Sequence, residues 1–127
     1  MPAFRLVLIA ALCALAAAGC GSDSGDSAAG PGEDAYQRYA CASCHSLDGD
    51  DGTGPSLKGL AGSTVTLEDG GRVKATREYL RRSILEPDAQ VVKGYSAGLM
   101  TASIDGFDLD SRPEDVDRLI EFIEGVK

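Results

Sequence analysis

Residues 41–45 read Cys-Ala-Ser-Cys-His and bring two thiols and one imidazole together within a single turn of chain. The Cys-x-x-Cys-His spacing is typical of the covalent attachment of a c-type haem. Two sulfurs three positions apart reach two vinyl groups on one porphyrin edge, and His45 offers a ring nitrogen to the iron from the same side. The motif therefore predicts one haem c, bound covalently through Cys41 and Cys44, with His45 as an iron ligand.

Two other uses of paired cysteines fit the rest of the chain less well. A thioredoxin-like Cys-x-x-Cys motif lies near a βαβ pattern, which this sequence does not offer. A structural zinc site needs four ligands, whereas the chain has at most three good ones once its N-terminal cysteines are set aside. A haem remains the favoured interpretation.

Counting the candidate residues limits the choice of a second iron ligand. His45 is the only histidine in the chain, so ligation by two histidines of one molecule is impossible. Met100 is the only methionine besides Met1, and it lies on a late loop between two expected helices. Ligation by His45 and Met100 is therefore predicted, and a thioether ligand raises the reduction potential of the iron. Lys93 and Tyr95 are the remaining alternatives.

Length and composition allow one small domain whose core is thin. The 127 residues include 6% aromatic residues and no Trp. A domain of this size buries only roughly 60–70% of its unfolded surface, so a haem would supply missing core volume. The formal net charge of −8 argues against nucleic acid as a partner. Positive charge gathers at Lys74, Arg77, Arg81 and Arg82, a dipolar arrangement that would orient an encounter with a redox partner.

The N-terminus has the pattern of an exported protein. Leu6–Ala18 is an uninterrupted apolar run preceded by Arg5, which is typical of a signal peptide over residues 1–19. The run is shorter than the ~20 residues that a membrane-spanning helix needs. We therefore expect export to the outer face of a bacterial cell membrane or to the periplasm.

The end of this run resembles a bacterial lipobox. The residues Ala17-Ala18-Gly19-Cys20 imply that Cys20 becomes the lipidated first residue of the mature protein. Residues 20–32 are rich in Gly, Ser and Asp and have no apolar periodicity, so they are predicted to form a flexible, lipid-anchored tether. The haem domain is then expected to occupy residues 33–127.

Periodicity and capping signals predict the elements of this domain. A hairpin is expected because apolar residues alternate with threonines before the turn at Asp69-Gly70-Gly71. The last helix has the capping-box spacing of Ser111 and Glu114, followed by an apolar stripe over residues 116–123. The predicted elements are a helix at Glu33–Ala42, a loop at Ser46–Gly62, a hairpin at 64–75, a helix from Thr76 to about Leu85, a loop at Asp88–Asp110 and a helix from Ser111 onward.

Beyond the motif, the chain from about Gly32 to its end resembles a class I single-haem c-type cytochrome. Segments 52–60 and 78–87 and the pair Gly94-Tyr95 are similar, more narrowly, to the cytochrome domain fused to subunit II of some bacterial cytochrome c oxidases. The resemblance implies an all-α fold of about three to four helices around the haem, with a small β-hairpin insertion.

The resemblance also implies roles for particular residues. The carbonyl of Pro55 would accept the N–H of the haem-binding histidine, which fixes the imidazole. The first and last helices would cross at Gly32, with Tyr36 and Phe122 as an aromatic pair. The residues lining the haem would be Leu57, Leu60, Tyr79, Leu80 and Ile84.

The chain departs from this family pattern around the predicted second ligand. Ser96-Ala97 and Thr101 stand where prolines are usual, and an extra acidic segment, Ser103–Asp110, separates Met100 from the last helix. Fewer prolines leave a loop with more conformations. The ligand loop is therefore expected to be less rigid than is usual.

The sequence thus predicts an electron carrier rather than an enzyme. The expected protein is a monomeric, membrane-anchored cytochrome that passes single electrons in a respiratory chain, with a terminal oxidase as the favoured acceptor. An alternative is the electron-accepting cytochrome subunit of a periplasmic dehydrogenase. A haem gas sensor or peroxidase is an alternative of another class, and it requires that Met100 does not bind the iron.

Overall fold

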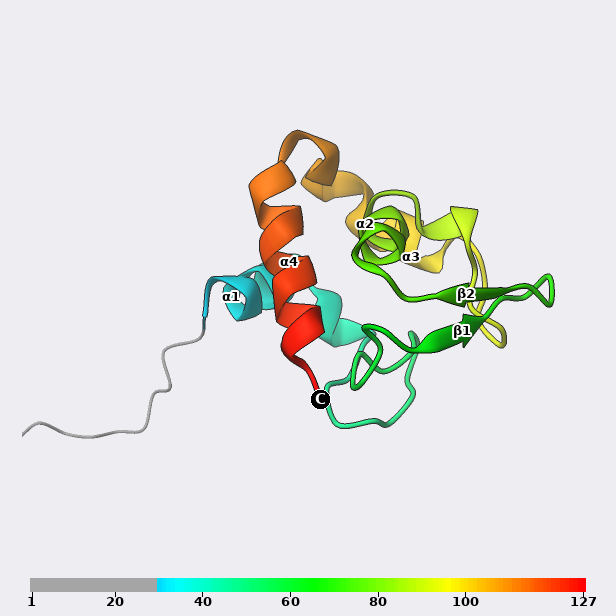
Figure 1. The fold of residues 1–127 in the computed structure, drawn as a ribbon. Helices are drawn as coiled ribbons and strands as arrows, with labels where there is room; N and C mark the ends of the chain where they lie inside the picture. The colour runs from blue at the N-terminus through cyan, green and yellow to red at the C-terminus, as the bar shows by residue number, and fades with distance from the viewer. Residues whose placement is uncertain (1–29) are drawn as a thin grey trace, which may run out of the picture.

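The computed structural model describes residues 30–127, which form a mainly helical domain with one small hairpin (Figure 1). The predicted signal peptide, the lipidation of Cys20 and most of the predicted tether lie outside the described residues. Within residues 30–127, no helix is long and apolar enough to cross a membrane. The elements are helices α1 (Pro31–Arg38), α2 (Arg77–Leu85), α3 (Leu99–Ile104) and α4 (Pro113–Gly125), and strands β1 (Thr64–Thr66) and β2 (Arg72–Lys74).

The first helix, α1, is shorter at its end than its sequence pattern predicts. It begins at Pro31, whose fixed φ suits the first helical position, rather than at Glu33. It ends at Arg38 instead of Ala42 because Ala40 adopts a left-handed conformation with φ of 55°. The chain then makes a separate 3₁₀ turn at Cys41–Ser43. The predicted helix boundaries at both ends were therefore wrong.

The hairpin and α2 agree with the prediction. Strands β1 and β2 pair antiparallel, with Val65 opposite Val73. Thr76 caps α2, because its hydroxyl oxygen accepts a hydrogen bond of 3.2 Å from the backbone N–H of Tyr79. The helix ends at Leu85, where the following Glu86-Pro87 pair disfavours further helix.

The segment predicted as a continuous loop, Asp88–Asp110, contains helix α3 and two 3₁₀ turns, at Asp105–Phe107 and Leu109–Ser111. The loop prediction was wrong because a helix of six residues has too few turns to leave a clear periodic pattern. Such a helix is stabilised by tertiary contacts rather than by its own propensity. Helix α3 contacts the 3₁₀ turn at Pro87–Ala89, which directly follows α2.

Helix α4 is the longest helix described, and it carries the predicted apolar stripe. Val116, Leu119, Ile120 and Ile123 are all buried. The predicted capping box is wrong, because the N-cap is Arg112, no side chain caps the helix, and Ser111 belongs to the preceding 3₁₀ turn. Pro113 at the first helical position starts the helix instead.

Helices α1 and α4 cross at close range, as the resemblance implies (Figure 1). A Cβ atom on Gly32 would lie 2.5 Å from the Arg118 carbonyl oxygen and 2.6 Å from Phe122 Cβ. Only glycine therefore allows this approach. The rings of Tyr36 and Phe122 pack beside it with centroids 5.3 Å apart.

The basic residues predicted as a patch for partner encounter are largely paired within the molecule. Arg77 of α2 contacts Glu124 at 2.8 Å and Asp117 at 3.3 Å, and Arg81 also contacts Asp117. Arg82 lies 3.5 Å from Glu86. These pairs join α2 to α4 or lie along α2, so the positive charge is compensated locally and the predicted dipole is weaker than the sequence suggests.

A second link between α1 and α4 depends on charge. The hydroxyl of Tyr39 donates a hydrogen bond to the carboxylate of Asp115, which also lies 2.8 Å from Arg118. The hydrogen bond from Tyr39, aided by Arg118, lowers the pKa of Asp115 below its ordinary value. The carboxylate therefore stabilises the fold above its unfolded pKa of about 3.9, and this contribution is lost as the pH falls through the lower, folded pKa.

We predict that Asp115→Asn lowers the urea midpoint of the holoprotein at pH 7, and that its difference from the wild type shrinks below about pH 4. The measurement is urea denaturation followed by circular dichroism across this pH range. Glu114→Gln, on the exposed side of the same helix, is the control and should change the midpoint little. A difference for Asp115→Asn that is as large at pH 3 as at pH 7 would contradict the assignment.

Candidate functional site

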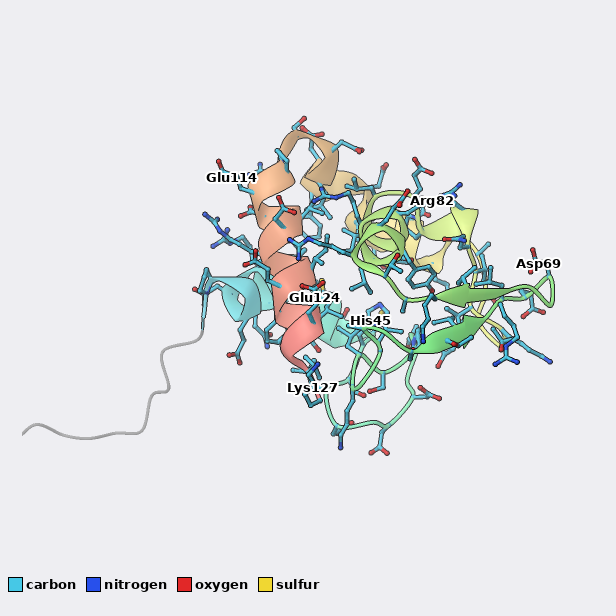
Figure 2. All side chains as sticks on the ribbon, in the orientation of Figure 1. His45, Asp69, Arg82, Glu114, Glu124 and Lys127 are labelled. Carbon is cyan, nitrogen blue, oxygen red and sulfur yellow. The ribbon has the colours of Figure 1, made fainter. Side chains whose placement is uncertain are left out.

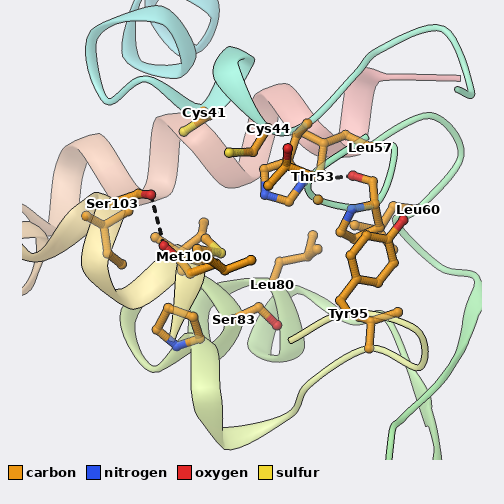
Figure 3. Close-up of a pocket in the computed structure, with 18 of the residues that line it drawn as sticks. Cys41, Cys44, Thr53, Leu57, Leu60, Leu80, Ser83, Tyr95, Met100 and Ser103 are labelled. Atoms are coloured by element: carbon orange, nitrogen blue, oxygen red, sulfur yellow. Dashed lines mark hydrogen bonds between the residues drawn. The ribbon is translucent and has the colours of Figure 1, made fainter. Parts of the chain in front are cut away.

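A cavity of about 500 Å³ opens in the middle of the domain, a size within the range of small-molecule and cofactor sites. The first 3₁₀ turn and the Gly-rich loop that follows it form one wall, and α2, α3 and the segment before α3 form the other. Figure 3 shows Cys41 and Cys44 on one side and Met100 on the opposite side. All the residues predicted to bind or line the haem lie on this one cavity: Cys41, Cys44, His45, Pro55, Leu57, Leu60, Tyr79, Leu80, Ile84 and Met100, with the alternative ligands Lys93 and Tyr95.

The backbone turn at residues 41–45 sets the direction of the two thiols and the imidazole. The left-handed Ala40 reverses the chain, and the carbonyl of Cys41 accepts hydrogen bonds from the N–H groups of Cys44 at 3.2 Å and His45 at 2.9 Å. The three side chains therefore leave a tight turn that is separate from α1, whereas the helix was predicted to continue to Ala42. All three reach the cavity.

Hydrogen bonds hold both the imidazole and the backbone of His45. Its Nδ1 lies 2.7 Å from the carbonyl oxygen of Pro55, and because a carbonyl only accepts, Nδ1 carries the proton. This bond fixes the tautomer and leaves Nε2 as the nitrogen with a free lone pair. The hydroxyl of Tyr36 donates to the backbone carbonyl of His45 at 2.5 Å. Figure 2 shows His45 in the interior, whereas the labelled side chains of Asp69 and Glu114 point outward.

Gly54 supports the same imidazole and was not singled out from the sequence. It is buried, and a Cβ atom at this position would lie 2.7 Å from Cε1 and 2.9 Å from Nδ1 of His45. The backbone of Gly54 is held in turn by the carbonyl of Cys44, which accepts its N–H at 2.9 Å. A glycine directly before Pro55 was the available signal, because glycine permits this close approach.

Met100 lies in the first turn of α3 and is half-buried at the far wall. Leu80 and Ser83, both from α2, line the cavity close to it in Figure 3. Lys93 and Tyr95 line the cavity from the segment that precedes α3. The structure therefore places a thioether and an imidazole on opposite walls of one largely apolar chamber.

The chemistry of this chamber fits a haem. Its apolar wall includes four predicted residues that are buried in the core, namely Leu57, Tyr79, Leu80 and Ile84. The hydroxyl of Ser83 is buried without a hydrogen-bond partner among the described residues, which is unusual unless a polar group of an occupant meets it. Burial raises the pKa of the Cys41 thiol to about 11, so this thiol is protonated at neutral pH.

The two rival uses of the cysteines find no support in the described part of the chain. A protonated Cys41 thiol is unlike the reactive thiolate of a redox Cys-x-x-Cys motif, and the hairpin is antiparallel, with no βαβ unit over residues 30–127. The same residues contain no group of three or more His, Cys, Asp or Glu side chains able to hold a metal ion. The thioredoxin-like and zinc interpretations are therefore disfavoured by structure as well as by sequence.

Comparison with protein families agrees with this arrangement. A family model described as cytochrome c matches residues 29–127 of the chain. The match covers the whole described domain and includes the Cys-x-x-Cys-His turn, the hairpin and all four helices.

Proposed function

The chain belongs to the cytochrome c family, and from this premise we propose that it is a membrane-anchored carrier that delivers single electrons to a terminal oxidase of a respiratory chain. The family membership establishes an electron-transfer haem protein of mainly α-helical fold. The anchor, the respiratory role and the acceptor belong to the proposal.

One haem c is the cofactor, attached covalently through Cys41 and Cys44. When bound, it supplies reversible one-electron exchange at its iron. We assign His45 and Met100 as the residues that would bind the haem iron, because they are the only imidazole and the only thioether among the described residues and they face one cavity. This juxtaposition is the observation that carries the proposal, since a closed His/Met site favours electron transfer over ligand binding.

The residues around these two ligands serve to hold a fixed geometry. The Pro55 carbonyl keeps the proton on Nδ1 of His45, and the Gly54 backbone lies against the ring. Buried apolar side chains exclude water from the cavity, which disfavours the more highly charged ferric state. A carrier needs a site that changes little between its two redox states, and this packing provides one.

The proposed anchor and acceptor are supported by sequence features. The apolar run ending in Gly19-Cys20 and the Gly-rich segment after it favour a lipid on Cys20 and a tether. The resemblance of segments 52–60 and 78–87 to oxidase-fused cytochrome domains favours a terminal oxidase. A lipid-anchored carrier would diffuse in two dimensions close to such an enzyme.

We predict that Cys20→Ala moves the protein from washed membranes to the soluble fraction with its haem spectrum unchanged. In wild-type membranes, oxygen should reoxidise the reduced haem in a cyanide-sensitive step, and loss of the anchor should slow this step several-fold. The measurement combines fractionation with absorption spectroscopy of the native host membranes. Wild-type protein that is already soluble after processing would refute the anchor, and reduction by a dehydrogenase substrate without cyanide-sensitive reoxidation would favour the dehydrogenase alternative.

A further inference from the structure

The segment that leads into Met100 donates backbone hydrogen bonds to two carboxylates, and only one of them contacts the start of α3. Gly94 and Gly98 both adopt left-handed conformations, with φ of 89° and 86°. The N–H of Gly94 donates to Glu68 at 3.0 Å, and the N–H of Gly98 donates to Asp88 at 2.7 Å. Gly98 turns the chain sharply directly before α3, so fixing its N–H fixes where the helix begins. Gly94 lies four residues farther from the helix.

Asp88 makes a second contact that Glu68 lacks. Its other carboxylate oxygen accepts a hydrogen bond of 2.9 Å from the hydroxyl of Thr101. Gly98 is the N-cap of α3 and Thr101 is its third residue. The carboxylate of Asp88 therefore binds the first turn of the helix at a residue before Met100 and at a residue after it. Asp88 itself lies in the 3₁₀ turn at Pro87–Ala89, directly after the well-packed α2.

We propose that Asp88 is a positioning residue that keeps the thioether of Met100 directed at the haem iron. This inference rests on the proposed function, in which Met100 is an iron ligand. Helix α3 has six residues and is too short to be stable by itself. Ser96, Ala97 and Thr101 also lack the stiffness that prolines would give the loop. Two hydrogen bonds to a charged acceptor supply the missing restraint.

Because Asp88 is exposed, its loss should loosen the loop without unfolding the core. The expected signature is faster replacement of Met100 by an external ligand. We expect Asp88→Ala to raise the rate of cyanide binding to the ferric holoprotein about tenfold, which corresponds to about 1.4 kcal/mol. The far-red absorption of a thioether–ferric haem bond should weaken in parallel.

Three further variants separate positioning from general loosening. Asp88→Asn should stay within about threefold of wild type, because its amide oxygen still accepts from Gly98 and its NH₂ group can donate to Thr101. Thr101→Val, which loses one of the two bonds, should raise the rate about threefold. Glu68→Ala is the matched control. Glu68 is also an exposed carboxylate that accepts a glycine N–H, but it makes no hydrogen bond to α3, so its loss should change the rate less than twofold.

The outcomes distinguish this inference from the function on which it rests. Wild-type protein that lacks the far-red band and binds cyanide as fast as an open haem would overturn both, because Met100 would then not be a ligand. A wild-type protein with the band, together with an Asp88→Ala variant that exchanges at the wild-type rate, would overturn only the role of Asp88. Equal acceleration by Asp88→Ala and Glu68→Ala would also overturn it.

Discussion

Replacing both Cys41 and Cys44 with Ala is expected to abolish covalent retention of haem, because each thioether bond needs its own sulfur. The substituted chain should also fail to fold. Without haem, the apolar side chains around the cavity of about 500 Å³ lose their packing partner, and a small domain has only about 5–15 kcal/mol of stability to lose. The measurements are acidic acetone extraction and far-ultraviolet circular dichroism of the purified protein.

The single variants are the controls for this experiment. Cys41→Ala and Cys44→Ala each keep one sulfur at the cavity wall, so each should retain some haem through acidic acetone treatment. Haem that stays with the doubly substituted chain under the same treatment would show that attachment does not use these sulfurs. A haem-free chain with a native dichroism spectrum would show instead that the cavity does not need an occupant.

Met100→Ala is expected to leave the haem covalently attached while lowering its reduction potential by roughly 0.1 V or more, within the ~0.8 V that axial ligands can span. At about 2.3 kcal/mol per elementary charge per 100 mV, this change is enough to reverse the direction of many electron transfers. A thioether favours ferrous iron, whereas water or hydroxide entering from solvent favours ferric iron. Redox titration measures the change.

The neighbour Leu99 provides the control for Met100. Leu99 is the large apolar side chain most exposed among the described residues, at 54%, and Leu99→Ala should leave the potential within a few hundredths of a volt of wild type. Met100→Ala should also admit carbon monoxide to the ferrous protein, whereas Leu99→Ala should not. A Met100→Ala protein with unchanged potential and no carbon monoxide binding would mean that Met100 only packs and that an alternative ligand, Lys93 or Tyr95, occupies the iron. Wild-type protein that already binds carbon monoxide readily would favour the sensor alternative.

The parts of the fold that the sequence predicted well are those in which local chemistry and packing agree. Thr76 caps α2 and Pro87 follows its end, so the predicted helix and the observed one coincide. The apolar residues at 116–123 repeat with a period of about 3.6 residues, so in a helix they lie on one face, and that face is buried. The site could be predicted for a related reason, since a chain with one histidine leaves few choices for an iron ligand.

The parts that were missed depend on contacts between distant segments. Nothing local in the sequence requires Ala40 to adopt a positive φ, an uncommon conformation for a residue other than glycine. It does so where the chain must leave α1 and direct Cys41 into the cavity. Helix α3 is likewise held from outside by Asp88, ten residues before Gly98. Ser111 fitted a capping-box pattern in the sequence, but it belongs to the 3₁₀ turn before α4 and does not cap the helix.

Tyr36 gives the fold a consequence for how the domain comes apart. Its ring packs on Phe122 at the crossing of α1 and α4, and its hydroxyl meets the carbonyl of His45. Separation of the two terminal helices would therefore remove one hydrogen bond from the backbone of His45 at the same moment. The two ends of the domain and the turn at His45 are therefore expected to open together, so under the proposed function fraying of the termini would also disturb a ligand of the haem.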